Sequence, residues 1–542
     1  MSITELAHDD PEVYEGPAPV DRITSFAQQR LWFQEQLGTM GSAYVLTQWV
    51  RFRGDLDHGV LARAFERAMD RHEALRTTFH MVDGELVQRI HPAEESVFPV
   101  VSRDLSGDPA PEEKLQRLMA REAERPFDLA RGPLIRAHLV RLSADEHVML
   151  VCVHHIAFDG WSIGVLMNEL SVVYSAIVRG EEDARPPLRT QYADYAEWQR
   201  EWLSGELVER QGDYWRAALA DAPELLELPA DRPRPARQDH AGALAAVELD
   251  EALTAQLRAL ARRNGVTLFA VLLAGWGATL GRLAGQTDVV VGTPAANRRG
   301  RELRGLIGYF ANTLALRVDL TGSPTVAELL RRVKTRTVEA QHHQDLPFEQ
   351  VVELLRPARS TSHTPLFQVS FTWQNAPAGA LRLGDVVFES TGSTAAEMAK
   401  FDLSLIMHEE DGRIAGRVEY ATALFDAATV ERYLGYYRRV LRAMADDDTQ
   451  PVESLPLIGE AERRMLVEEW NATGAEFPAH ACIHELFEAW AECAPHATAV
   501  VQEGESLTYA ELNARANRLA HHLVGQGVGA ETYVALLLPR SV

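Results

Sequence analysis

An apolar run followed by a helical repeat is the clearest pattern in the first half of the chain. Residues 148–153 are continuously apolar and rich in β-branched side chains, and the run is too short for a buried helix. From 163 to 177 apolar residues recur at helical spacing, and Ser162 is placed to cap that helix. The pattern predicts a core strand, a sharp turn over 154–160 and a helix.

Strand and helix patterns also occur in the second half of the chain. Residues 253–283 are helix-like, the short run 289–291 is typical of a core strand, and 402–407 alternates as a strand does. We therefore predict a protein of the α/β class.

Charged and proline-rich segments indicate where the chain divides. Residues 181–187 and 446–451 are charged and broken by proline, and 9–21 combine acids with proline and glycine. These breaks predict a flexible leader at 1–22, a first lobe at 23–180, a second lobe at 181–450, a linker at 451–477 and a separate segment at 478–542.

Composition excludes several classes of function. The chain has 542 residues and a net charge of −24, which disfavours binding to nucleic acid or to an anionic membrane. Its three cysteines, Cys152, Cys482 and Cys493, are too few and too scattered for a disulfide scaffold or a zinc site. The first residues have no signal-peptide pattern, and we recognise no membrane-spanning stretch. We expect a cytoplasmic protein without a bound metal.

The predicted turn carries the candidate chemistry. His154 and His155 end the strand, and Asp159 and Gly160 follow four residues later. Because successive strand residues face opposite sides, one histidine is expected to be catalytic and the other structural. A single histidine beside a core strand is more often a packed core residue, but an imidazole can also accept a proton from an attacking amine.

This turn resembles the hallmark of the condensation domains of nonribosomal peptide synthetases, which is two histidines, three variable residues, aspartate and glycine. Five further segments resemble the motifs of that family in the expected order. They are Ser25–Trp32, Arg71–Phe79, Tyr192–Trp198, Ile307–Thr313 and His343–Glu349.

The resemblance implies a fold and a reaction. The fold is two lobes, each similar to a chloramphenicol acetyltransferase subunit, that form a V-shaped pseudo-dimer with the active site between them. The reaction is amide formation between a donor acyl or peptidyl thioester and an acceptor aminoacyl thioester. His155 would contact the attacking amine, either as a base or as a hydrogen-bond acceptor that orients it.

The resemblance also suggests roles for the neighbouring residues. His154 would fix the turn, and the N–H of Gly160 could help to bind an oxyanion. Asp159 is expected to form a structural ion pair, with Arg76 as the first candidate partner and Arg30 as a weaker one. Asn312 could contact substrate, although a structural asparagine is an equal alternative.

The last part of the chain resembles a different family. Residues 507–513 are similar to the first motif of an adenylation domain, but the phosphate loop and the later lysine of adenylate-forming enzymes are absent. Residues 478–542 are therefore expected to be the truncated start of an adenylation domain with no complete activity. No phosphopantetheine attachment motif occurs, so both substrates would arrive on the arms of partner carrier proteins, and no tightly bound cofactor is expected.

Two alternatives compete with the condensation reaction. Gly160–Gly164 fits the Gly-x-Ser-x-Gly pattern of a hydrolase, with Ser162 as the nucleophile and His343 as a conceivable base. Folds of this class can also serve as catalytically silent docking platforms.

Overall fold

The computed structural model describes residues 18–36, 44–358, 360–374, 383, 386–392, 398–539 and 541–542. The chain divides into two units, Met1–Ile458 and Gly459–Val542, and the division falls inside the predicted linker. Residues 1–17 of the predicted leader lie outside the described residues. Strand β1 (Val20–Ile23) pairs with β4 (Glu85–Ile90), so ordered structure begins before the predicted lobe boundary at residue 23.

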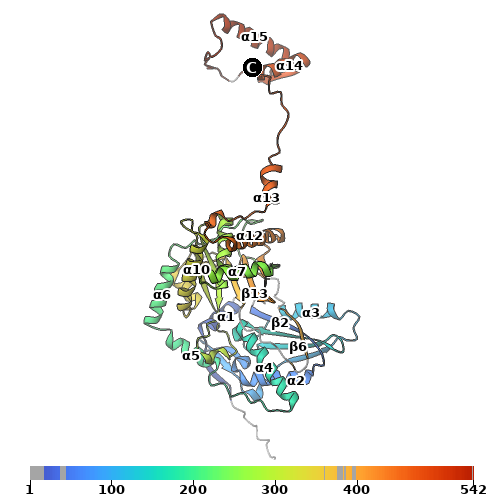
Figure 1. Cartoon of the computed structure of the whole chain (residues 1–542), viewed down its shortest axis with the longest axis vertical. Helices are drawn as coiled ribbons and strands as arrows, with labels where there is room; N and C mark the ends of the chain where they lie inside the picture. The colour runs from blue at the N-terminus through green and yellow to red at the C-terminus, as the bar shows by residue number, and fades with distance from the viewer. Residues whose placement is uncertain are drawn as a thin grey trace, which may run out of the picture. The chain divides into compact units, whose positions relative to one another are not determined.

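The first lobe of unit 1 is built on a five-stranded sheet in the order β12-β2-β7-β6-β5. Its apolar central strand β7 confirms the strand expected at 148–153, and it is buried because the sheet is covered on both faces. Helices α2 and α4 contact each other on one face, and α3 packs on the other (Figure 1). The bounds are β2 (Val45–Arg53), β5 (Val100–Asp104), β6 (Ile135–Arg141), β7 (Glu146–His154), β12 (Val387–Gly392), α2 (His58–Arg71), α3 (Pro111–Glu124) and α4 (Gly160–Arg179).

A smaller layer accompanies this lobe. Strands β1, β4 and β3 form a three-stranded antiparallel sheet, which lies next to the first motif of the sequence. Its elements and the helices that connect the lobes are α1 (Phe26–Gln36), η2 (Glu73–Arg76), β3 (Thr77–Val82), η3 (Ala93–Glu95), α5 (Tyr192–Trp202) and α6 (Glu206–Ala218).

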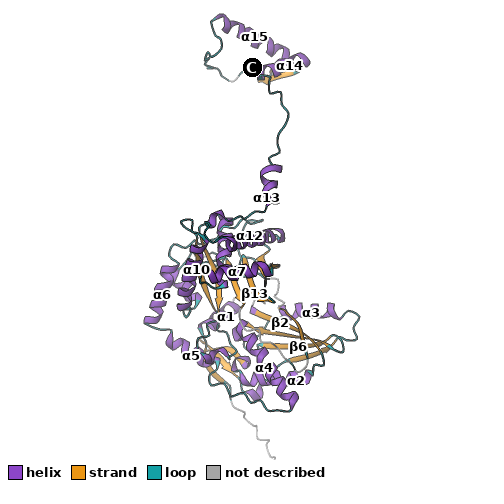
Figure 2. Ribbon diagram, viewed as in Figure 1, coloured by secondary structure: helices purple, strands orange, loops and turns teal. Residues whose placement is uncertain are grey.

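The second lobe is built on a six-stranded mixed sheet in the order β10-β9-β11-β13-β14-β8. Figure 2 labels β13 of this sheet, with helices of the second lobe around it. Strand β11 runs parallel to both of its neighbours, and the other pairs are antiparallel. The strands are β8 (Gly242–Leu249), β9 (Asp288–Ala295), β10 (Asn312–Asp319), β11 (Val369–Gln374), β13 (Leu403–Glu410) and β14 (Arg413–Ala421). The helices are α7 (Glu251–Arg263), α8 (Leu268–Ala284), α9 (Arg301–Arg304), α10 (Val326–His342), α11 (Phe348–Leu355) and α12 (Ala427–Asp446), and η5 covers Val452–Ser454.

The helix-like pattern at 253–283 is two helices rather than one. Helices α7 and α8 meet at an angle of 105°. Gly265 has a φ of +60°, which ends the first helix, and Thr267 caps the second by accepting a hydrogen bond from the N–H of Ala270.

Strand β12 joins the two lobes. It belongs to the chain segment of the second lobe, yet it pairs antiparallel with β2 at the edge of the first lobe's sheet. This pairing covers the edge of β2, makes β12 the new edge strand and connects the lobes through backbone hydrogen bonds.

Unit 2 has little core of its own among the described residues. Ala491 and Leu507 are buried there, whereas Ile483 is 88% exposed and Leu537 is 97% exposed. Its elements are α13 (Glu460–Arg464), η6 (Met465–Glu469), α14 (Ile483–Cys493), β15 (Thr498–Gln502), β16 (Glu505–Thr508) and α15 (Tyr509–Gly525).

Helix α4 is long and apolar enough to cross a membrane by length and composition. This differs from our expectation that no stretch would reach that length. The helix packs against α2 and the five-stranded sheet, and half of its apolar window is buried, which is typical of a core helix.

Candidate active site

Asp159 caps the helix that follows β7 and its turn. After His154 the chain forms one 3₁₀ turn, η4 (His155–Ala157), and α4 begins at Gly160. Oδ1 of Asp159 accepts a hydrogen bond from the N–H of Ser162 at 2.9 Å. The prediction that Ser162 caps the helix is therefore wrong, because Asp159 is the capping residue and Ser162 lies inside the first turn of α4.

One ring nitrogen of His155 is fixed by the turn itself. Nδ1 lies 2.8 Å from the carbonyl oxygen of Phe158, and since a carbonyl only accepts, Nδ1 carries the hydrogen. In the neutral ring Nε2 then has a free lone pair, and it makes no hydrogen bond to the residues that the structure describes. Burial lowers the pKa of His155 to about 4; the positive charge of Lys400 acts in the same direction and the carboxylate of Asp159 opposes it. His155 is therefore a neutral hydrogen-bond acceptor at physiological pH.

His154 lies in a different environment from His155. It is 1% exposed, and its Nδ1 accepts a hydrogen bond from the N–H of Ile156 at 3.1 Å. Its Nε2 lies 3.9 Å from Oε2 of Glu35. The ring is thus held inside the turn, between the backbone and a carboxylate of α1.

Asp159 forms a buried ion pair with an arginine of the second lobe. Its Oδ1 lies 2.8 Å from Nη2 of Arg298, and the two side chains are 1% and 2% exposed. Oδ2 accepts a hydrogen bond from the N–H of Phe310 at 3.1 Å, and the Arg298 guanidinium lies over the Phe310 ring. Burial lowers the pKa of Arg298, and the ion pair with Asp159 counteracts that effect. The carboxylate therefore links the turn after β7 to the segment that precedes β10.

The sequence-based prediction that Arg76 pairs with Asp159 is wrong, and so is the alternative with Arg30. Arg76 ends η2, where it donates to the carbonyl oxygen of His91 and lies 3.6 Å from Glu73. Arg30 lies on α1 and pairs with Glu349 at 2.5 Å. Both guanidinium groups already have partners on neighbouring elements. Arg298 was missed because it lies 139 residues from Asp159 in a chain with 54 lysine and arginine residues.

Ser162 does not have the surroundings of a nucleophile. It is fully buried, and its hydroxyl contacts Asp159, Arg298 and the backbone of Gly308. The conceivable base His343 instead stacks on Tyr214 with 4.0 Å between ring centroids, and its Nδ1 contacts the carbonyl oxygen of Glu339. The Gly-x-Ser-x-Gly match is thus a packing and hydrogen-bonding feature of the lobe interface.

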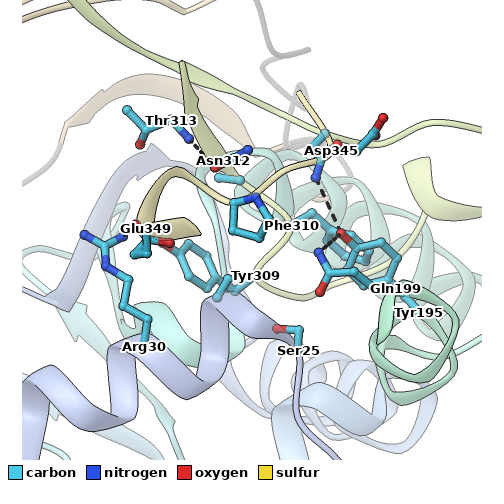
Figure 3. A pocket seen from close by; sticks show the side chains of 14 residues that line it. Ser25, Arg30, Tyr195, Gln199, Tyr309, Phe310, Asn312, Thr313, Asp345 and Glu349 are labelled. Carbon is cyan, nitrogen blue, oxygen red and sulfur yellow. Dashed lines mark hydrogen bonds and ion pairs between the residues drawn. The ribbon is translucent and has the colours of Figure 1, made fainter. Parts of the chain in front are cut away.

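A polar cleft lies beside the turn that carries His155 (Figure 3). In Figure 3, Arg30 and Glu349 lie on one side of the Tyr309 ring, and Tyr195, Gln199 and Asp345 lie on the other. The Tyr309 ring also meets His155 edge-on, with 4.8 Å between centroids. The cleft is lined by Ser25, Ala27, Arg30, Tyr195, Gln199, Asn297, Tyr309, Phe310, Ala311, Asn312, Thr313, Asp345, Pro347 and Glu349.

Asn312 lines this cleft, but its amide is occupied. Nδ2 donates to the carbonyl oxygens of Gln344 and Leu346 at 2.7 and 2.9 Å. Oδ1 accepts from the N–H groups of Thr313 and Phe348. These four bonds favour the structural alternative for Asn312, which ties β10 to the segment before α11.

Gly160 begins α4 and has open space around it. Gly160 is exposed, and a Cβ added to it would meet nothing within 4 Å, so packing inside the protein does not require a glycine there.

Among the described residues, no group of three or more histidine, cysteine, aspartate or glutamate side chains could hold a metal ion.

Comparison with known proteins identifies the family. The family model "Condensation domain" matches residues 21–467, and the model "AMP-binding enzyme" matches 487–542. The chain is 46% identical over 543 residues to malpinin synthetase of Mortierella alpina, covering 100% of this chain and 7% of that protein. It is 43% identical over 530 residues to a linear gramicidin synthase of Brevibacillus parabrevis, covering 97% of this chain and 7% of that protein. The X-domain from teicoplanin biosynthesis, also solved in complex with OxyB, is 32% identical with a TM-score of 0.71, and the match covers 82% of this chain and 99% of the X-domain.

These matches place the fold among two-lobed acyltransferase-type domains. The chain belongs to the condensation domain family of nonribosomal peptide synthetases, and a short fragment of an AMP-binding enzyme follows that domain. It spans only 7% of the length of these two synthetases.

Proposed function

We propose that this chain joins a donor acyl or peptidyl thioester to an acceptor aminoacyl thioester by forming an amide bond. Both substrates would be carried on the phosphopantetheine arms of carrier proteins. One observation carries the proposal: the bond from Nδ1 of His155 to Phe158 leaves the lone pair of Nε2 free beside the cleft.

The free lone pair of Nε2 suits an incoming amine. An amine N–H of the acceptor would donate to Nε2, which aligns the nitrogen lone pair with the donor carbonyl carbon. The C–N bond forms as the carbonyl electron pair moves to oxygen, and the C–S bond of the donor then breaks. Because the pKa of His155 is about 4, the imidazole is a weak base, which favours an orienting role over complete removal of the proton.

The other residues of the turn would position this group. Asp159 and Arg298 hold the start of α4 against the segment before β10. His154 holds the turn through the hydrogen bond that its Nδ1 accepts from the N–H of Ile156. The absence of a side chain at Gly160 leaves space where a thioester carbonyl could approach the first N–H groups of α4.

The reaction also defines the partners. A thioester is already activated, so alignment and one proton transfer suffice, and we propose that no tightly bound cofactor takes part. The partners would be a donor and an acceptor peptidyl carrier protein and the adenylation domain that the AMP-binding fragment begins. We propose that the reaction takes place in the cytoplasm.

One observation favours a second candidate, a catalytically silent docking platform. The X-domain that is 32% identical to this chain was solved in complex with OxyB, so a domain of this fold can bind another protein. The ordered turn at His155 favours catalysis instead, because a platform needs no imidazole with a free Nε2.

A condensation assay separates these candidates. Donor and acceptor groups are loaded on separate carrier proteins, mixed with the purified chain and followed by mass spectrometry. We expect the joined product on the acceptor carrier. Free hydrolysed acid, together with labelling of Ser162 by a serine-directed phosphonate, would favour the hydrolase, and a stable complex without any product would favour the platform.

A further inference from the structure

Lysine is rare in this chain, and one lysine is placed unlike the others. Among 54 lysine and arginine residues, lysine occurs only at positions 114, 334 and 400. Lys114 and Lys334 are exposed; the first pairs with Asp108, and the second donates to a backbone carbonyl. Lys400 is partly buried, and its Nζ makes no ion pair or hydrogen bond with any residue that the structure describes.

The ammonium of Lys400 lies beside the catalytic turn. Its Nζ is 4.6 Å from the centroid of the Tyr44 ring, and Tyr44 packs at 6.4 Å against the ring of His154. The charge is close enough to His155 to lower the pKa of the imidazole. The aromatic face of Tyr44 thus holds a cation next to the proposed reaction centre.

Among the described residues, the charges around Lys400 leave it without a dedicated counter-ion. Arg30 brings a like charge close to Lys400. The carboxylate of Glu349 is already paired with Arg30. Glu419 on β14 favours the charged form of Lys400 while it pairs with Arg417. Burial, and to a lesser extent Arg30, lowers the pKa of Lys400 to about 8, so most of the ammonium is charged at pH 7.

A buried charge without a partner destabilises a protein, unless a ligand supplies the opposite charge. The condensation reaction creates such a charge, because attack on a thioester converts its neutral carbonyl oxygen into an oxyanion. A cation already fixed near that oxygen stabilises the transition state more than the ground state.

We propose that Lys400 is a further catalytic residue whose ammonium binds the carbonyl oxygen of the donor thioester as that oxygen becomes negative. The inference rests on the proposed condensation reaction. The acceptor nitrogen attacks the carbonyl carbon, and the C=O electron pair moves to the oxygen beside Lys400. When that pair returns, the C–S bond breaks, and the leaving thiolate takes up the proton that the amine loses. Lys400 keeps its own protons and supplies only charge.

The two groups then act on different atoms of the same intermediate. His155 accepts a hydrogen bond from the nitrogen, and Lys400 donates to the oxygen. The same positive charge that lowers the pKa of His155 keeps its Nε2 lone pair available. A compact ammonium suits a single oxygen, whereas the planar guanidinium of arginine suits two-oxygen ligands such as carboxylates.

The test compares the variants Lys400→Met and Lys400→Arg with the matched control Lys334→Met. The single-turnover rate constant of condensation is measured between pH 6 and 10 with loaded carrier proteins. The Lys400→Met rate should fall by about 10²- to 10³-fold, as it does on removal of one oxyanion donor. Wild type and Lys334→Met should behave alike.

The pH profile separates catalysis from a structural role. The charged form of Lys400 is active, so the wild-type rate should fall as pH rises through about 8. Lys400→Arg stays charged, and this fall should disappear. An unchanged basic fall in Lys400→Arg, or a Lys400→Met rate within threefold of wild type, would overturn the inference.

The controls distinguish this inference from the proposed function. Absence of product with wild type and with Lys334→Met would contradict the condensation reaction itself, and with it any oxyanion role for Lys400. Product with both, combined with either negative result for the Lys400 variants, would contradict only the role of Lys400. If Lys400→Met does not fold, as judged by thermal unfolding, the Lys400→Arg profile decides.

Discussion

At the scale of single residues, one ion pair fixes the turn that carries His155. Asp159 and Arg298 are both almost fully buried, and each would be costly to leave alone. Arg298 also donates to the carbonyl oxygens of Leu303 and Leu306, so it holds the second-lobe segment as well as the carboxylate. The pair therefore determines where His155 lies relative to the cleft.

Breaking this pair on one side should cost more stability than removing both charges. Arg298→Met leaves a buried carboxylate unpaired, and we expect a loss of about 3–5 kcal/mol in the free energy of unfolding. The double variant Arg298→Met/Asp159→Asn should be more stable than Arg298→Met alone. Urea denaturation measures the free energy of unfolding of Arg298→Met, of Asp159→Asn and of the double variant. If the losses of the two single variants simply add up to the loss of the double variant, the ion pair is contradicted.

The low pKa of His155 predicts a broad acidic range of activity. The neutral imidazole is the active form, and it is lost only as pH falls through about 4. Between pH 7.5 and 5.5 the condensation rate should therefore follow only the protonation of the acceptor amine, with no additional fall from an ordinary histidine with a pKa near 6.5. A second, additional fall centred near pH 6.5 in the single-turnover rate would show that burial and Lys400 do not act on His155 as described.

Sequence reasoning reached the local part of the site and missed its long-range part. The turn with His155 and Asp159 could be predicted because its residues are contiguous and follow a recognisable strand. Arg298 and Lys400 could not, since only the fold brings them to the turn, and nothing in their local sequence marks them. Ser162 is a plausible cap by sequence because it directly precedes the apolar repeat of the helix. Asp159 precedes the same repeat, so the local sequence does not decide between the two residues.

At the scale of elements, the segment between α9 and β10 positions the cleft. The backbone of Gly308 contacts Ser162, and Tyr309 meets His155 from the same segment. Its path leaves no space at residue 308, where an added Cβ would lie 2.1 Å from the buried Tyr192 ring. Close backbone approach, rather than an unusual φ, therefore explains this glycine.

Two glycines of that segment offer a matched comparison. Gly308→Ala should lower the free energy of unfolding by about 1–3 kcal/mol because the Tyr192 ring must move. Gly305→Ala should change it by less than about 0.5 kcal/mol, since its Cβ would meet nothing within 4 Å. Thermal unfolding of the two variants tests this, and equal effects would contradict the packing described for residue 308.

Element prediction succeeded where periodicity was strong. The strands expected at 148–153, 289–291 and 402–407 correspond to β7, β9 and β13. The 253–283 region was predicted without its bend, because apolar spacing continues across Gly265. The pairing of β12 with the sheet of the other lobe could not be predicted, since strand pairing between distant segments leaves no local pattern.

At the scale of the whole molecule, the chain consists of two units with different amounts of core. Unit 1 contains the five-stranded, six-stranded and three-stranded sheets and the described site, whereas unit 2 buries few of its described apolar side chains. All the residues described for the site belong to unit 1.

Removal of residues 475–542, which make up most of unit 2, should leave the reaction intact. A shortened chain of residues 1–474 retains the whole match to the condensation family, and we expect its single-turnover rate constant to stay within twofold of the full chain. Its thermal unfolding temperature should also be unchanged. A large loss of activity in this shortened chain would show that residues 475–542 contribute to the site.

The most direct test of the central claim is the single-turnover rate constant of condensation for His155→Ala. The account predicts a loss of about 10²- to 10⁴-fold, with the thermal unfolding temperature preserved, because the ring is partly buried and Nε2 makes no hydrogen bond to the residues that the structure describes. His408→Ala on β13 is the matched control, and it should react like wild type. A His155→Ala rate within a few-fold of that control would contradict the assignment of His155 as the group that holds the acceptor amine.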